Sequence, residues 1–222
     1  MWGERIAMAC KACELFLKSL PRNSRFNIVS FGDGYSQMFA SPEHYSKASL
    51  EQAIKGLRTF DADMGGTEIY PALDAIYKNK PDAAYPRNIF LLTDGAVSSP
   101  QMVVNLVAKN ARLARCHTFG IGSGASRELV KKAALAGKGS YQFTNDGETN
   151  MNGKVIASLT RAVKPALSGL TADFGEGLLL QGPHTLPIVF HDQPFALLGV
   201  LKAGSAGMLR LEGVETQKGA KY

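Results

Sequence analysis

The sequence has few of the features that mark a secreted or membrane-bound protein. Only three of its 222 residues are cysteines (Cys10, Cys13 and Cys116), too few for the disulfide framework of a small extracellular domain. No apolar run approaches roughly 20 residues, the length that a membrane-spanning helix needs. The first residues also lack the basic-then-apolar pattern of a signal peptide. We therefore expect a cytoplasmic protein that does not interact with membranes.

Histidine is also sparse, which argues against the common hydrolytic and metal sites. The four histidines are scattered, with no HxxxH pair and no GxSxG serine motif, so we expect His117, inside a predicted strand, to be packed or hydrogen-bonded. Cys10 and Cys13 have CxxC spacing, but they fall in the middle of an apolar helix face. No second pair of ligands completes a zinc site. We therefore interpret both cysteines as core residues.

The formal net charge of +6 is spread along the chain. No run of five or more basic residues occurs, and no aromatic stacking motif accompanies the basic positions. The charge therefore predicts solvated helix surfaces and no nucleic-acid partner.

Hydrophobic residues make up 45% of the chain, enough for one sizeable core and an additional piece. Helical and strand patterns alternate up to about residue 165. Helices are expected at 3–20, 41–57, after Thr67, and at 101–114, 126–136 and 152–163, and strands at 25–31, 35–39, 88–93, 116–121 and 139–143. This alternation predicts an α/β, Rossmann-like domain at residues 1–165, with a mainly parallel sheet and helices on both faces. Residues 166–222 hold short apolar runs separated by Gly and Pro, which predicts an incomplete β-rich segment.

Two loops carry the residue types of a cation site. Asp94 directly follows the buried strand pattern of residues 88–93, at the end of a strand where open α/β sheets bind ligands. An unpaired carboxylate at that place is costly unless a cation, a donor or water meets it. Thr67, in the glycine-rich loop 63–68, supplies the hard oxygen that Mg²⁺ or Mn²⁺ prefers. Thr67 and Asp94 are therefore predicted to form half of a metal site.

The segments that carry these residues resemble a known family. MGGTEI (64–69), NIFLLTDGAV (88–97) and CHTFGIGSG (116–124) are similar to the third, fourth and fifth blocks of a von Willebrand factor type A domain, and RFNIVSFG (25–32) is similar to its second strand. The loops look most like the von Willebrand factor A domain-containing protein 5 type, a group related to the inter-alpha-trypsin inhibitor heavy chains. The resemblance implies a non-enzymatic, protein-binding module. In that family, a divalent cation at a metal-ion-dependent adhesion site binds an acidic side chain of the partner protein.

The chain departs from this family at its first residues. In the family, the first strand lies in the middle of the sheet and ends in an Asp-x-Ser-x-Ser loop whose serines bind the metal, whereas this sequence opens at the following helix. We therefore expect a truncated domain without its central strand, which folds poorly alone. We also expect it to bind Mg²⁺ or Mn²⁺ weakly or not at all.

Two other functions compete with this interpretation. Gly120, Gly122 and Ala125 satisfy GxGxxA after a strand and before a helix, with Asp146 some twenty residues further on, a formal dinucleotide fingerprint for an NAD-type enzyme. The motif lies late in the α/β region, however, and the family resemblance already explains its glycines as a strand-to-helix turn. A purely structural scaffold would use neither the Gly120–Ala125 turn nor the cation residues.

Overall fold

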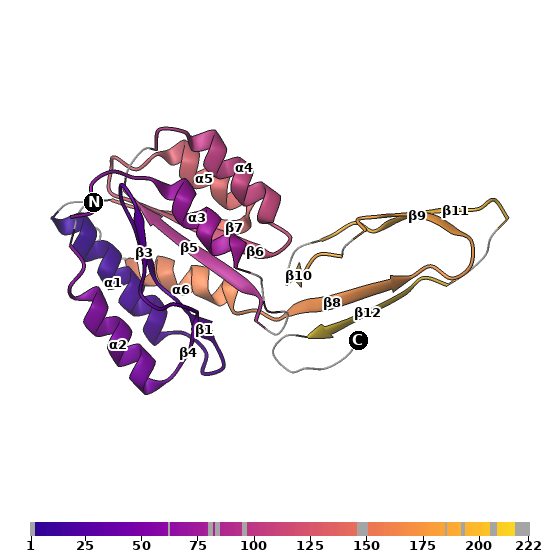
Figure 1. Cartoon of the computed structure of the whole chain (residues 1–222), viewed down its shortest axis with the longest axis horizontal. Coiled ribbons are helices and arrows are strands. Elements are labelled where there is room, and N and C mark those ends of the chain that lie inside the picture. Colours follow the sequence, from indigo (N-terminus) through magenta and orange to yellow (C-terminus); the bar gives the residue numbers. More distant parts are fainter. Residues whose placement is uncertain are drawn as a thin grey trace. The chain divides into compact units, whose positions relative to one another are not determined.

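The computed structural model describes residues 3–61, 63–79, 82, 85–94, 97–145, 151–184, 186–191, 194–204 and 208–215. The chain divides into two compact units (Figure 1). The first unit comprises Met1–Lys80 and Arg87–Val163, and the second comprises Pro81–Pro86 and Lys164–Tyr222. No helix among the described residues is both long and apolar enough to cross a membrane.

The first unit contains helices and strands in alternation. Its helices are α1 (Glu4–Lys18), α2 (Lys47–Leu57), α3 (Ile69–Lys78), α4 (Pro100–Asn110), α5 (Arg127–Ala136) and α6 (Met151–Ala162). Its strands are β1 (Arg25–Phe26), β2 (Val29–Phe31), β3 (Tyr35–Gln37), β4 (Glu43–His44), β5 (Arg87–Thr93), β6 (Ala114–Ile121) and β7 (Lys138–Thr144). The strands β5, β6 and β7 form a parallel sheet in that order, which is the doubly covered α/β arrangement that the pattern predicts.

Side chains on the two faces of this sheet enter separate apolar clusters, because neighbouring residues of a strand point to opposite faces. Ile89 and Leu91 pack with α3, α4 and α5, whereas Leu92 packs with α1 and α6 together with Phe119 and Ile121 of β6. Figure 1 shows these two helix layers on either side of the sheet. Every residue of β6 is buried, as expected for the middle strand of a sheet with helices on both faces.

The prediction of one continuous strand at 25–31 is wrong, because the segment forms two strands, β1 and β2, that Asn27 separates. Oδ1 of Asn27 accepts hydrogen bonds from the backbone N–H groups of Ile28 (2.8 Å) and Phe39 (3.1 Å), and Nδ2 donates to the carbonyl of Phe39 (2.8 Å). The segment before Asn27 pairs with β4 and the segment after it pairs with β3, both antiparallel. A side chain that bonds its own backbone competes with a continuous ladder.

The predicted helix at 41–57 is wrong at its start. Residues Glu43–His44 form β4, and α2 begins at Lys47 after the N-cap residue Ser46. The Ser46 hydroxyl accepts the backbone N–H of Ser49 (3.1 Å), and the Ser49 hydroxyl accepts that of Ser46 (2.9 Å). This reciprocal capping box determines where the helix begins.

The second unit contains only strands among its described elements. They are β8 (Ala166–Asp173), β9 (Leu178–Gly182), β10 (Val189–Phe190), β11 (Leu198–Leu201) and β12 (Arg210–Glu215). All pairings are antiparallel, with β10, β8 and β12 in one sheet and β11 and β9 in another. Apolar side chains on the β9–β11 ribbon remain exposed, including Leu179 (61%) and Leu198 (70%).

The strand β5 has the burial of an interior strand but the pairing of an edge strand. Among the described strands it pairs with β6 alone, and β2 pairs with β3 alone. Ile89, Leu91, Leu92 and Thr93 are nevertheless buried, a pattern typical of strands with neighbours on both sides and unlike an ordinary polar edge. The central strand that the family resemblance places beside β5 stays a prediction.

Candidate metal centre

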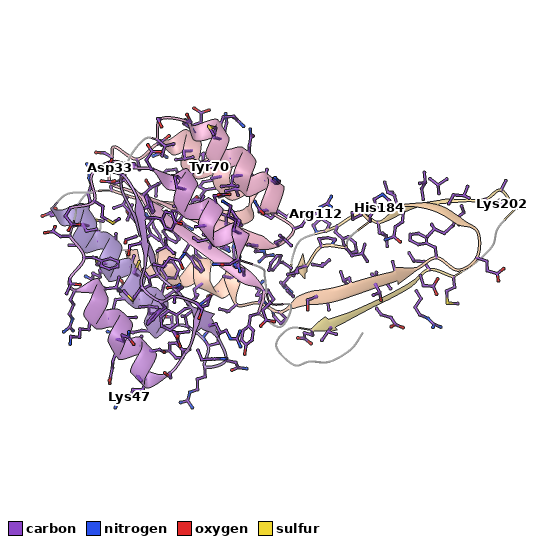
Figure 2. All side chains as sticks on the ribbon, viewed as in Figure 1. Asp33, Lys47, Tyr70, Arg112, His184 and Lys202 are labelled. Atoms are coloured by element: carbon purple, nitrogen blue, oxygen red, sulfur yellow. The ribbon has the colours of Figure 1, made fainter. Side chains whose placement is uncertain are left out.

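The loop that carries Thr67 is clasped by Asp33 of the turn between β2 and β3. Oδ1 of Asp33 accepts the backbone N–H of Gly66 (2.8 Å), and the backbone N–H of Asp33 donates to the carbonyl of Met64 (2.7 Å). Asp33 is labelled in Figure 2. One hydrogen bond to the Asp33 carboxylate and one from its backbone N–H therefore hold the two segments in a single arrangement.

The glycines of this loop leave room for that clasp. A Cβ atom at Gly65 would lie 2.1 Å from Oδ2 of Asp33, and one at Gly66 would lie 2.5 Å from Oδ1. Gly65 also has φ of 75°, which favours glycine. Sequence analysis missed Asp33, which it treated as part of a tight turn, although a carboxylate between Gly32 and Gly34 was a signal that could have drawn attention to it.

The clasp positions Thr67 at the start of α3. The backbone N–H of Glu68 donates to the carbonyl of Gly32 (2.8 Å), and α3 begins at the next residue, Ile69. Thr67 itself is half-buried, so its hydroxyl belongs to an ordered loop. Glu68 occupies the N-cap position and makes no side-chain capping bond.

Asp94 lies at the carboxyl end of β5, as predicted. Thr93 before it is buried and Asp94 is half-buried, whereas Gly95 and Ala96 lie outside the described residues. A Cβ atom at Gly124 would lie 3.4 Å from Nη1 of Arg5 and 3.6 Å from the carbonyl oxygen of Asp94. The first turn of α1 therefore brings a guanidinium to the end of β5, a neighbour that sequence analysis did not predict.

The donors present match a divalent cation in kind but not in number. Thr67 and Asp94 offer hard oxygens from loops that adjoin the same apolar cluster, since Ile69 and Leu91 both belong to it. Mg²⁺ needs six ligands in near-octahedral geometry, and water or another segment would have to supply most of them. Within the part of the chain that the structure describes, no group of three or more His, Cys, Asp or Glu side chains is arranged to hold a metal.

Packing accounts for the glycines of the Gly120–Ala125 turn. A Cβ atom at Gly120 would lie 2.7 Å from the ring of Phe143 and 3.1 Å from the Cβ of Ala125, and Gly122 has φ of 78°. The Ser126 hydroxyl caps α5 by accepting a backbone N–H. Asp146, the acidic residue of the formal fingerprint, lies outside the described residues. The Phe143 ring and Ala125 beside Gly120, and the positive φ of Gly122, are therefore sufficient to account for these glycines.

Cys13 packs as expected, whereas Cys10 belongs to none of the described apolar clusters. Cys13 contacts both the α1–α6 cluster and a third cluster beneath α2, and burial, together with the neighbouring Cys10, raises its thiol pKa to about 12. Cys10 is half-buried and its pKa is also raised by burial. Raised thiol pKa values oppose the thiolate chemistry that a redox CxxC motif needs.

His117 is packed and hydrogen-bonded, as predicted for a histidine inside a strand. Its ring stacks on Phe90 with centroids 5.0 Å apart, and Nδ1 accepts the backbone N–H of Ser140 (3.1 Å) and lies 2.9 Å from the Ser140 hydroxyl. The Ser140 hydroxyl is in turn 3.3 Å from that of Ser158 on α6. Nδ1 therefore already accepts a backbone N–H, and Nε2 is buried without a hydrogen-bond partner among the described residues.

Comparison with known proteins identifies the family. The family model for the von Willebrand factor type A domain matches residues 1–143. A von Willebrand factor A domain-containing protein of Dictyostelium discoideum is 32% identical over 90% of the chain, and rat von Willebrand factor A domain-containing protein 5A is 38% identical over 75%. The chain spans about a fifth of the length of these relatives, 22% and 20% respectively.

Solved structures share the fold at lower identity. A von Willebrand factor type A protein from Catenulispora acidiphila superposes with a TM-score of 0.63 at 18% identity, covering 98% of this chain and 59% of that one. Proximal thread matrix protein 1 of the mussel byssus, solved with zinc in its metal-ion-dependent adhesion site, gives 0.55 at 17% identity, covering 78% of this chain and 45% of that one. Domains of this type are generally protein-interaction modules and not enzymes, and they often bind a divalent metal. The chain belongs to the von Willebrand factor type A domain family.

Proposed function

We propose that the chain is a protein-binding module that recognises its partner through a divalent cation held by Thr67 and Asp94. The observation that carries the proposal is the Asp33 clasp, which holds the Thr67 loop by hydrogen bonds of 2.7 and 2.8 Å at the end of β2. Asp94 directly follows β5, and the clasp holds the Thr67 loop beside the end of β2, so each donor lies near the end of a strand, where ligands of open α/β sheets bind.

In this proposal, two serine hydroxyls of a further strand between β2 and β5 complete the protein ligands of the cation. Support comes from β5, whose side chains are buried although it has a strand partner on only one side among the described elements. Such a strand would end beside Asp94 and raise the number of protein oxygens to four, leaving positions for water and the partner. An acidic side chain of the partner protein fills one of those positions, since carboxylate oxygens suit Mg²⁺ and Mn²⁺.

Calorimetry with Mg²⁺ and Mn²⁺ tests this function. The 222-residue chain is expected to bind either ion weakly. Mg²⁺ gives up its bound water reluctantly, and two protein oxygens seldom replace enough of it to hold the ion. A version extended at its N-terminus by an apolar strand ending in Asp-x-Ser-x-Ser is expected to bind it well. Asp94→Ala should abolish that binding, and Asp74→Ala should leave it unchanged because Asp74 pairs with Lys78 on the α3 surface (2.7 Å).

Two results would contradict the proposal. One is tight metal binding by the 222-residue chain that Asp94→Ala does not affect. The other is an extended version that binds Mg²⁺ but binds its protein partner equally well in a chelator, since the partner carboxylate is proposed to contact the cation.

A further inference from the structure

An open groove runs beside β7, away from the candidate metal centre. Its volume is about 420 Å³, and it is lined by Leu135 of α5, residues 139–142 of β7, and Ala157, Ser158 and Arg161 of α6. The groove therefore lies at the outer edge of the parallel sheet, between two helices.

The backbone of β7 turns some of its hydrogen-bonding groups towards the side away from β6. The carbonyl of Thr144 accepts the N–H of Gly122 (2.8 Å) and so faces β6, whereas the carbonyl of Phe143 accepts the Lys154 ammonium of α6 and so faces outward. Successive residues of a strand turn their backbone N–H and C=O groups to opposite sides. The N–H and C=O of Tyr141, two residues before Phe143, therefore also face outward. No described strand pairs with this side of β7, and such an edge is a template for another strand.

The side chains around the groove are apolar and basic. Leu135 is 68% exposed and Tyr141 is 38% exposed, so both present apolar surface to solvent. The Lys131 ammonium lies 5.9 Å from the centre of the Tyr141 ring, and Arg161 is exposed on the α6 side. The lining contains no acidic side chain, so its charge favours an anionic occupant.

The floor of the groove is held in place by a bulge in β7. Cys116 of β6 pairs with Lys138 of β7, and Thr118 pairs with Tyr141, so two residues of β7 (139 and 140) stand opposite His117 alone. The backbone N–H of Ser140 donates to Nδ1 of His117 instead of to the β6 backbone. A Cβ atom at Gly139 would lie 2.1 Å from the carbonyl oxygen of Cys116, so only glycine allows this approach. Bulges often lie where a sheet edge is shaped for binding.

We propose that the β7 edge binds an extended, acidic segment of a partner protein by strand addition. The partner's backbone pairs with the outward N–H and C=O of Tyr141. Its apolar side chains pack on Leu135 and Tyr141, and its carboxylates contact Arg161 and Lys131. This site is independent of the cation proposed above, because none of its residues belongs to the Thr67 or Asp94 loops.

A fluorescent peptide tests the proposal. The probe alternates valine with threonine over about eight residues and carries two glutamates, and its control has lysines in their place. The acidic peptide is expected to bind the 222-residue chain, as measured by anisotropy, and Arg161→Glu is expected to weaken binding by at least roughly tenfold through charge reversal. Lys11→Glu, an equal charge change on the exposed surface of α1, is the matched control and should leave binding unchanged.

Hydrogen exchange tests the pairing itself. The Tyr141 amide should gain protection when the acidic peptide binds, whereas the amides of β12 in the other unit should not change. Equal binding of the lysine peptide, equal affinity of Arg161→Glu and Lys11→Glu, or an unprotected Tyr141 amide in the complex would each overturn the proposal. So would tighter binding of a single-stranded oligonucleotide, because the groove would then be a nucleic-acid surface.

Discussion

A single buried histidine makes folding dependent on pH. Burial, together with the nearby charges of Arg115 and Arg161, lowers the pKa of His117 from 6.5 to about 4. The side chain is only 1% exposed, so the ring is neutral at physiological pH and its Nδ1 remains free to accept the Ser140 N–H.

The sign of the pH effect follows from this lowered pKa. In the unfolded chain the ring takes up a proton below about pH 6.5, whereas the folded protein resists protonation until about pH 4. The contribution of His117 to stability is therefore complete above pH 6.5 and is lost as the pH falls towards 4, by up to about 3 kcal/mol. Urea unfolding at pH 7 and pH 4 should show a smaller loss for His117→Asn than for the natural protein.

His184→Asn is the control for that comparison, because His184 is exposed and His117 is not. Its loss of stability between the two pH values should equal that of the natural protein. If His117→Asn also loses the same amount, the histidine is not the group that titrates.

The two helix cysteines should differ in reactivity. Cys13 packs between two clusters and its thiol pKa is about 12, whereas Cys10 is half-buried, so a thiol reagent at pH 8 should label Cys10 first. Cys13→Ala should lower the free energy of unfolding by about 1 to 2 kcal/mol through lost packing. Mass spectrometry of the labelled protein measures the order. Faster labelling of Cys13, or a Cys10–Cys13 disulfide, would favour a redox role instead.

Single residues were predictable where their role depends on local pattern. The positions of Cys13 and His117 follow from apolar periodicity, and both are packed as predicted. Asp33 and Arg5 could not be found this way, because each contacts loops that are distant in sequence. The roles of Thr67 and Asp94 as ligands remain predictions.

At the scale of elements, the loop clasp offers the sharpest stability test. Gly65→Ala would place a methyl group against the Asp33 carboxylate and force a positive φ on an alanine, which should cost roughly 2 kcal/mol or more. Gly34→Ala is the matched control, because a Cβ there meets nothing within 4 Å. Urea unfolding of both variants measures the difference.

A double-mutant cycle separates the two causes. Adding Asp33→Ala to Gly65→Ala removes the clash but not the backbone strain, so the two changes should be strongly non-additive. Additive effects, or equal costs at Gly34 and Gly65, would show that the carboxylate does not hold the loop.

Elements were predicted best where the apolar pattern is long. The strands β5 and β6 and the helices α5 and α6 fall where the periodicity places them. Prediction failed at residues 25–31 and 41–46 because a long-range side-chain bond from Asn27 and a capping box at Ser46 decide those boundaries. Neither contact is encoded in hydrophobic spacing.

At the scale of the whole molecule, the edge of β5 away from β6 is expected to destabilise the folded chain. Its side chains are buried on both faces, yet the backbone edge away from β6 pairs with no strand among the described residues. Exposed apolar side chains of β9 and β11 add a second surface of this kind. Unpaired edges and exposed apolar strands both recruit other chains.

We therefore expect the 222-residue chain alone to bind a hydrophobic dye and to unfold over a broad range of urea concentration. Extension by the apolar strand ending in Asp-x-Ser-x-Ser should pair with β5, bury its edge and give one cooperative transition without dye binding. An extension of equal length made of glycine and serine is the control, because it adds chain but no strand-forming or apolar residues. A 222-residue chain that is monomeric, binds no dye and melts sharply would show that β5 needs no further neighbour, and the serine donors proposed for the cation would then have no strand to carry them.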